Sequence, residues 1–169
     1  MSPTGRLARL GLLGSAALIL FMLEGMVPKP LPWMRLGLGN AAVLLGLLTQ
    51  GTAAGLAISA LKAVGGGFLS GGFANPAFVI GGGAGLASVL AMGLCRRMTG
   101  ALFSPVGLSV IGSLVHQTVQ LGLAYLLYVR QESLWGLLPV FLLVGLLSGG
   151  LTGLLVAWVL ARLRAWGRV

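Results

Sequence analysis

The chain alternates long apolar runs with short connections that are polar or rich in proline and glycine. A helix needs about 20 apolar residues to cross the hydrocarbon layer of a membrane. This pattern predicts an all-α, polytopic membrane protein in which residues 1–169 form one integral membrane domain. About six transmembrane helices are expected in one bundle, at residues 10–27, 36–49, 52–69, 77–94, 105–129 and 134–161.

Two features qualify this pattern. The run at 36–49 is short for a full crossing, so we expect it to be tilted, broken or buried inside the bundle. Three consecutive glycines occur at 65–67 and again at 81–83, and each glycine weakens a helix by about 1 kcal/mol relative to alanine. Broken helices persist in membranes where they are buried or line a cavity. The glycines therefore indicate either tight helix packing or the wall of a binding cavity.

Composition supports a membrane class and excludes a soluble one. Hydrophobic residues make up 57% of the chain and charged residues only 8%, against roughly 25% charged residues in a soluble domain. The net charge of +9 does not predict nucleic-acid binding, because Lys and Arg stand singly or in pairs between apolar runs. Nucleic-acid binders gather them on one face. Membrane lipids are therefore the expected surroundings.

The same charges predict an orientation. Six spans place seven Lys and Arg on the side of both termini and three on the other side, with Lys62 inside a span. The positive-inside rule then puts both termini in the cytoplasm, in a multi-pass protein of the cytoplasmic membrane. Arg6 and Arg9 before the first apolar run resemble the start of a signal peptide, but no small-residue cleavage site follows. We expect this run to be retained as the first helix.

The polar inventory excludes most enzyme chemistry. Glu24 and Glu132 are the two acidic residues, and aspartate is absent. Prenyl diphosphate synthases of the head-to-tail type need clustered aspartates for magnesium and diphosphate, and the sequence has no phosphate loop for ATP. One histidine and one cysteine, His116 and Cys95, do not supply a metal site. We predict a non-enzyme without metal or cofactor.

Polar residues inside the spans are the candidate binding residues, because intramembrane charges usually face a cavity or a partner. Lys62 lies in the middle of its span, where it either snorkels to the surface, holds an anionic ligand group or pairs with Glu24. Glu24 ends the first span and has Lys29 and Arg35 as alternative partners. His116 and Gln120 share one helix face, where they either join helices by hydrogen bonds or line a pocket. The candidate site is Glu24, Arg35, Asn40, Lys62, His116 and Gln120, placed in the outer half of the bundle.

Two strings resemble a known family. The first runs from Pro28 through Arg35, Gly37 and Gly39 to Asn40, and the second from Phe103 through Gly112 to His116, Gln117 and Gln120. They are similar to the heptaprenyl diphosphate synthase component I family, also called the Gx transporter family, over about residues 10–160. This chain departs from the family at Gln117, where asparagine is usual, and at Lys62, where an arginine is usual nearby.

The wider pattern resembles the substrate-binding (S) components of energy-coupling-factor (ECF) transporters. That resemblance implies a small-molecule substrate, with an anionic group suited to Arg35 and Lys62, and energy from partner ATPases and a coupling membrane protein. Gly11 and Ser15, four residues apart, are the expected docking face for that partner. The alternative is a non-catalytic membrane subunit of a heptaprenyl diphosphate synthase or an accessory protein of isoprenoid or quinone synthesis. A purely structural scaffold is the third possibility, and it predicts that Lys62 and His116 tolerate apolar substitution.

Overall fold

The computed structural model describes residues 3–26, 37–69, 71–100 and 102–167, and within these ranges every regular element is a helix. The predicted all-α class is therefore confirmed. The α-helices are α1 Pro3–Gly25, α2 Asn40–Gln50, α3 Thr52–Leu69, α4 Pro76–Thr99, α5 Pro105–Ala124 and α6 Leu138–Ala165. Shorter turns extend them: the 3₁₀ turn η1 at Gly72–Ala74, the π-helical turn η2 at Tyr125–Val129 and the 3₁₀ turn η3 at Glu132–Leu137.

Five of the predicted spans are long and apolar enough to cross a membrane: α1, α3, α4, α5 with η2, and η3 with α6. The second span differs from these. With 11 residues, α2 is about 16 Å long, roughly half the hydrocarbon thickness. Most of its residues are buried among the other helices, so the buried alternative for this segment is the one observed. Its expected start at residue 36 lies outside the described residues.

Charged side chains hold both ends of α2. At the C-terminal end, Arg96 Nη1 in the last turn of α4 donates to the carbonyl oxygens of Leu47 at 2.8 Å and Leu48 at 3.1 Å. At the N-terminal end, the N–H groups of Gly37 and Leu38 donate to the Glu24 carboxylate of α1. Helix ends in an apolar medium need such partners, since water is absent there. These contacts therefore tie the two ends of α2 to α1 and α4.

The triple glycines do not break their helices, in contrast to what their helix propensity indicated, because α3 and α4 continue through residues 65–67 and 81–83. Packing explains their presence. The Phe21 ring occupies the space where a Cβ at Gly66 would lie, and a Cβ at Gly67 would lie 2.7 Å from Phe78 Cδ2. Glycine therefore lets aromatic rings lie directly against the α3 backbone.

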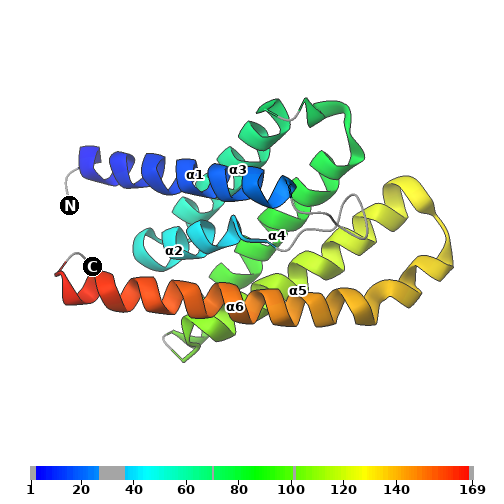
Figure 1. Cartoon of the computed structure of the whole chain (residues 1–169). Coiled ribbons are helices and arrows are strands. Elements are labelled where there is room, and N and C mark those ends of the chain that lie inside the picture. Colours follow the sequence, from blue (N-terminus) through cyan, green and yellow to red (C-terminus); the bar gives the residue numbers. More distant parts are fainter. Residues whose placement is uncertain (1–2, 27–36, 70, 101, 168–169) are drawn as a thin grey trace.

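Small residues also join α5 to α6. Three glycines of α6, spaced four residues apart, face three residues of α5 with the same spacing. The pairs are Gly145 with Gln117, Gly149 with Ser113, and Gly153 with Ser109. A Cβ at Gly149 would lie 3.0 Å from the Val110 Cα atom. Helices α5 and α6 therefore pack closely at Gly149 and Gly153, and they form the antiparallel pair in Figure 1.

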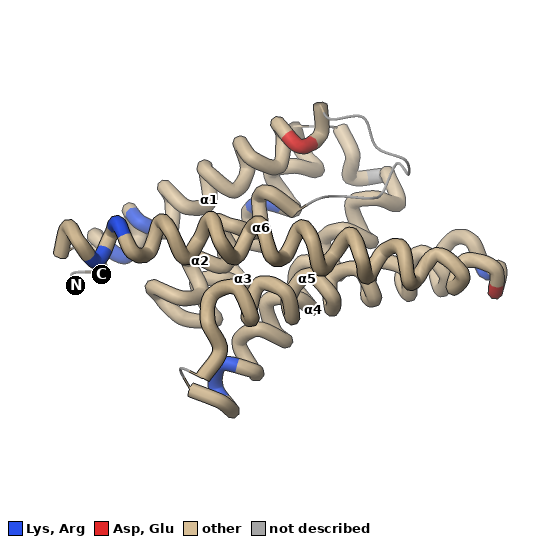
Figure 2. The backbone as a smooth tube through the Cα atoms, turned by 60° about the horizontal axis from the view of Figure 1, so that its bottom comes forward, with Lys and Arg blue, Asp and Glu red and all other residues tan. Residues whose placement is uncertain are grey.

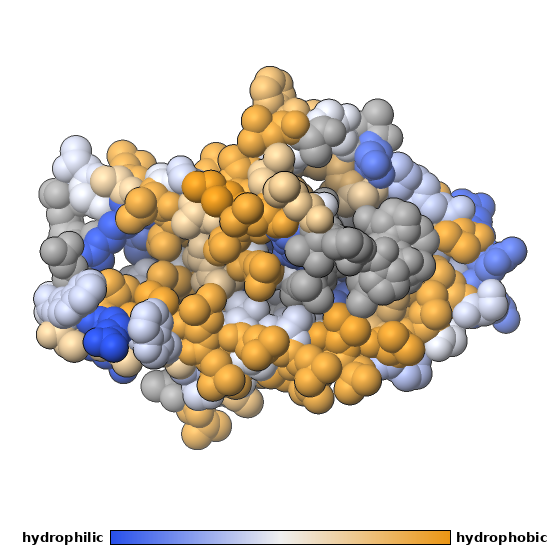
Figure 3. All heavy atoms as spheres, in the orientation of Figure 1, coloured by the Kyte–Doolittle hydropathy of each residue, from blue (hydrophilic) through white to orange (hydrophobic). Residues whose placement is uncertain are grey.

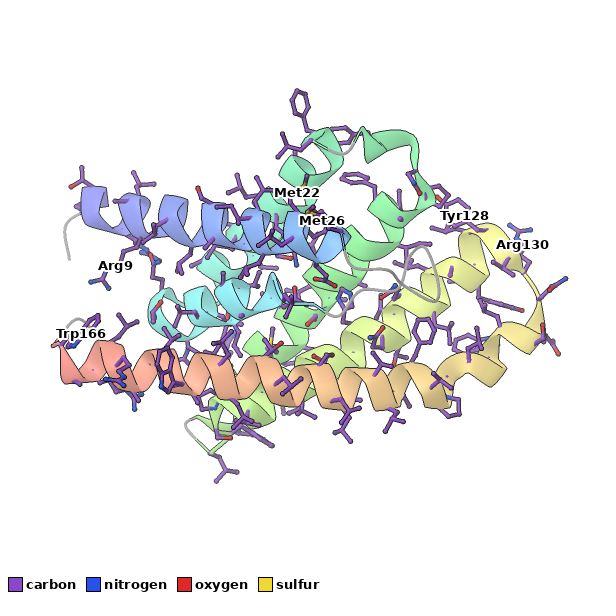
Figure 4. All side chains as sticks on the ribbon, in the orientation of Figure 1. Arg9, Met22, Met26, Tyr128, Arg130 and Trp166 are labelled. Carbon is purple, nitrogen blue, oxygen red and sulfur yellow. The ribbon has the colours of Figure 1, made fainter. Side chains whose placement is uncertain are left out.

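Both chain termini lie at the same end of the bundle (Figure 1). Among the described residues, most Lys and Arg gather toward that end, and few charged residues lie at the opposite end (Figure 2). Figure 4 places Arg9 and Trp166 at the end with the termini, and Tyr128 and Arg130 at the opposite end. On the face shown in Figure 3, apolar side chains cover much of the described surface between the two ends, and many large apolar residues are exposed along the helices. This distribution suits a multi-pass membrane protein with lipid around its flanks.

Candidate functional site

A cavity of about 80 Å³ lies where α1, the start of α2, α3, α4 and α5 meet. Glycines of three segments form much of its wall, including Gly39, Gly66, Gly67, Gly81 and Gly82. Neighbouring atoms fill the Cβ positions of Gly66 and Gly67, whereas Gly81 faces open space. A Cβ at Gly81, for example, would meet no heavy atom within 4 Å. The polar residues that line the same cavity are Glu24, Asn40, Ser59, Lys62, Asn75 and His116.

The amino group of Lys62 lies inside the bundle rather than at its surface. The Lys62 side chain is only 8% exposed, and its Nζ donates to Asn40 Oδ1 at 2.5 Å. Asn40 is the first residue of α2, so this ammonium lies at a helix N-terminus. The N-terminus of a helix carries about half a positive charge. The positive charge of Lys62 and that of the helix N-terminus therefore lie together at one side of the cavity. Lys62 does not snorkel to the surface.

Glu24 supplies a negative charge to the same cavity. Its side chain is 1% exposed, with Oε1 accepting from the Gly37 N–H at 2.8 Å and Oε2 accepting from the Leu38 N–H at 3.0 Å. Backbone N–H groups were not among the partners expected from the sequence. Two of the expected partners, Lys29 and Arg35, lie outside the described residues. The prediction that Arg35 belongs to the candidate site therefore also falls outside them. The carboxylate both lines the cavity and ties the chain before α2 to α1.

Of His116 and Gln120, only His116 lines the cavity. His116 of α5 is 7% exposed and lines the cavity. Gln120, one turn further on, is fully buried but does not belong to the cavity wall. Gln117 packs against α6, because a Cβ added at Gly145 would lie 2.9 Å from its Cγ atom. Four of the six predicted residues, Glu24, Asn40, Lys62 and His116, therefore meet at one cavity.

Two lining residues were not singled out from the sequence. Ser59 is 2% exposed and precedes Lys62 by three residues, a spacing that puts both on one helix face. Asn75 caps α4, with its Oδ1 accepting from the Ala77 N–H at 3.0 Å, and Pro76 follows at the first helical position. The sequence signal for Asn75 indicated a turn and helix start, but not its place at the cavity.

The site thus combines one buried ammonium, one carboxylate, an imidazole, two carboxamides and a hydroxyl. Within the described part of the chain, no group of three or more His, Cys, Asp or Glu is placed to hold a metal ion. These groups can bind a small polar molecule by charge and hydrogen bonds. The predicted docking residues lie elsewhere: Gly11 and Ser15 are exposed on α1, away from the cavity.

The fold and the site together define a polytopic helical membrane protein with a small polar cavity inside its bundle. Residues 13–159 match the sequence profile of the family described as heptaprenyl diphosphate synthase component I. The chain belongs to this family. A search of curated proteins found no match.

A solved structure shares the fold. The chain is similar to the S component of a bacterial ECF transporter, with a TM-score of 0.76. The alignment covers 99% of this chain and 100% of the other, at 17% sequence identity. Helix arrangement is therefore common to the two proteins although few side chains are shared.

Proposed function

We propose that this protein is the substrate-binding component of a membrane transporter for a small molecule with an anionic group, energised by partner proteins. The observation that carries the proposal is the Lys62 ammonium, buried at the N-terminus of α2 and facing a cavity. A buried charge is expensive unless it serves a partner or a ligand. The fold shared with an ECF S component supports the same function.

The cavity groups have complementary roles in this proposal. Lys62 attracts the anionic group, and the α2 dipole reinforces that attraction. Asn40, Asn75, Ser59 and His116 can orient the ligand by hydrogen bonds, since each side chain offers donor or acceptor atoms. Glu24 holds the chain at Gly37 and Leu38 in place and accepts from donor groups of the ligand.

Energy must come from other proteins, because the sequence has no phosphate loop. An exposed part of α1 offers a contact for a coupling protein. Gly11 and Ser15 are both exposed on this helix, and a Cβ at Gly11 would meet nothing within 4 Å. Small residues at this spacing let another helix approach closely. We place this contact on the cytoplasmic half of the bundle, with both termini in the cytoplasm.

The family description supports a second candidate, a non-catalytic membrane subunit of a prenyl diphosphate synthase. The absence of aspartate from the sequence still excludes a catalytic role of the magnesium-dependent kind. The neighbouring genes discriminate between the two functions. Genes for transport ATPases favour the transporter, whereas a gene for an aspartate-rich synthase favours the subunit.

The direct test is to purify the protein in lipid nanodiscs and identify co-purified small molecules by mass spectrometry. We expect an anionic compound that is retained by the wild type and by Lys62→Arg but lost from Lys62→Met. The change to methionine keeps the length of the side chain and removes its charge. His116→Leu should weaken retention as well. Folded, monodisperse Lys62→Met and His116→Leu proteins that keep the compound would contradict the proposed site, and unfolding of both would favour the purely structural role.

A further inference from the structure

A second cavity adjoins the first at the N-terminus of α4. Its volume is about 260 Å³, and it lies between Asn75, Pro76, Ala77 and Ile80 on one side and Ala124, Tyr128 and Val129 on the other. Apolar side chains dominate this lining. Asn75 and Ala77 line both cavities, so the two spaces share one wall.

Helix α5 connects the same two cavities. His116 lines the polar cavity, and Ala124 and Tyr128 line the apolar one. Gln120, midway between His116 and Ala124, is fully buried and lines neither cavity. Tyr128 belongs to η2, at the end of the bundle opposite the termini (Figure 4). Helix α5 with η2 therefore borders both cavities, at positions two or more turns apart.

The polar cavity is too small to enclose a metabolite alone. At about 80 Å³ it has room for a charged group of a few atoms, whereas small-molecule sites usually measure about 300–1,000 Å³. A ligand of ordinary metabolite size that is anchored at Lys62 would therefore extend beyond the cavity. Together the two cavities reach the lower end of the usual range.

We propose that the ligand is an amphipathic anion that occupies both cavities. Its anionic group lies beside Lys62, and its apolar part passes Asn75 and Ala77 into the space between Ile80, Ala124 and Val129. At Ala77 the shared wall carries only a methyl side chain. This inference rests on the function proposed above and adds the class of ligand to it.

Straight-chain carboxylates from propanoate to octanoate are suitable probes, with binding to the full-length protein in nanodiscs measured by calorimetry. The Lys62→Met protein in the same lipid corrects for partition into the membrane. We expect affinity to rise about fourfold with each added methylene, the change expected when a CH₂ group leaves water for an apolar site. The rise should stop once the apolar cavity is filled.

Val129→Phe tests the apolar cavity directly, because the larger ring takes up space within it. This variant should bind propanoate as the wild type does but lose the increase with chain length. Leu126→Phe is the matched control, since Leu126 is 61% exposed and lines neither cavity. It should keep the full increase.

The possible results separate the two proposals. If no carboxylate binds the wild type in a manner that depends on Lys62, the anionic site itself is refuted, and the proposal for the ligand fails with it. Binding that requires Lys62 but does not change with chain length would overturn the amphipathic ligand and leave the transporter function standing. The same conclusion follows if Val129→Phe and the wild type show equal increases. The series on the wild type needs no substitution, so it decides the matter even if Val129→Phe does not fold.

Discussion

Lys62 and Asn40 are hydrogen-bonded, with Lys62 Nζ 2.5 Å from Asn40 Oδ1, although 22 residues separate them in the sequence. The contact joins the middle of a long helix, α3, to the first residue of the short helix α2. Because α2 begins inside the bundle, its N-terminus and the lysine share one cavity. A charge that is costly in lipid is thereby placed beside a polar group and at the wall of a cavity.

Glu24→Gln should destabilise the protein. The buried carboxylate accepts two backbone N–H bonds, and a neutral amide can accept only through its one oxygen. Bonds to a charged group contribute roughly 1.5–3 kcal/mol each, so we expect a clear fall in the unfolding temperature in nanodiscs. Glu132→Gln is the control, since Glu132 is exposed. Equal unfolding temperatures for the two variants would show that Glu24 does not hold the start of α2.

Gly81→Leu should abolish ligand retention without unfolding the bundle. Its Cβ would meet no heavy atom within 4 Å, and the rest of the side chain would enter the cavity. Gly150→Leu is the matched control, because its Cβ also meets no heavy atom within 4 Å, yet Gly150 does not line the polar cavity. Mass spectrometry of co-purified compounds and thermal unfolding provide the two readouts. Retention of ligand by a folded Gly81→Leu protein would exclude this cavity as the binding site.

Cys95 reports on the orientation in the membrane. It is partly exposed and directly precedes Arg96 and Arg97, near the end of α4. With the termini in the cytoplasm, a membrane-impermeant maleimide should leave Cys95 unlabelled in intact cells and label it after permeabilisation. A Cys95→Ser, Ser133→Cys protein moves the thiol to an exposed position at the other end of the bundle and should be labelled from outside. The reverse pattern would invert the proposed orientation.

Bulky residues at Gly11 and Ser15 should prevent docking of a coupling protein. Gly11→Leu and Ser15→Leu add side chains to an exposed part of α1, so the fold should tolerate them. Co-purification with the partner should fall at least tenfold, because two helices can no longer approach closely. Leu12→Trp alters a residue that is 72% exposed on a neighbouring part of the helix and should have little effect. An intact complex in both Leu variants would exclude Gly11 and Ser15 as the docking face.

The sequence by itself determined the class of the protein and the approximate bounds of its helices. Apolar runs of membrane length report directly on burial in lipid, so 52–69 was predicted with the bounds that α3 has in the structure. The predicted start at Pro105 is that of α5, and the predicted start at residue 77 is one residue after Pro76, where α4 begins. The intramembrane lysine and histidine were recognisable as candidate site residues because polar groups are rare in such runs.

Only the tertiary structure decided which of these polar residues meet. A helix pattern states which face a residue occupies but not which helix it opposes, so Lys62 was not assigned to Asn40, nor Glu24 to the Gly37 and Leu38 backbone. Every residue has a backbone, so the identity of a residue does not indicate that its backbone N–H will bind a particular side chain. His116 and Gln120 share a face by sequence, but a cavity has finite depth, and only His116 lies within its reach. The triple glycines were read as weak points of a helix, whereas packing of Phe21 and Phe78 against them is a relation between helices that a single sequence does not contain.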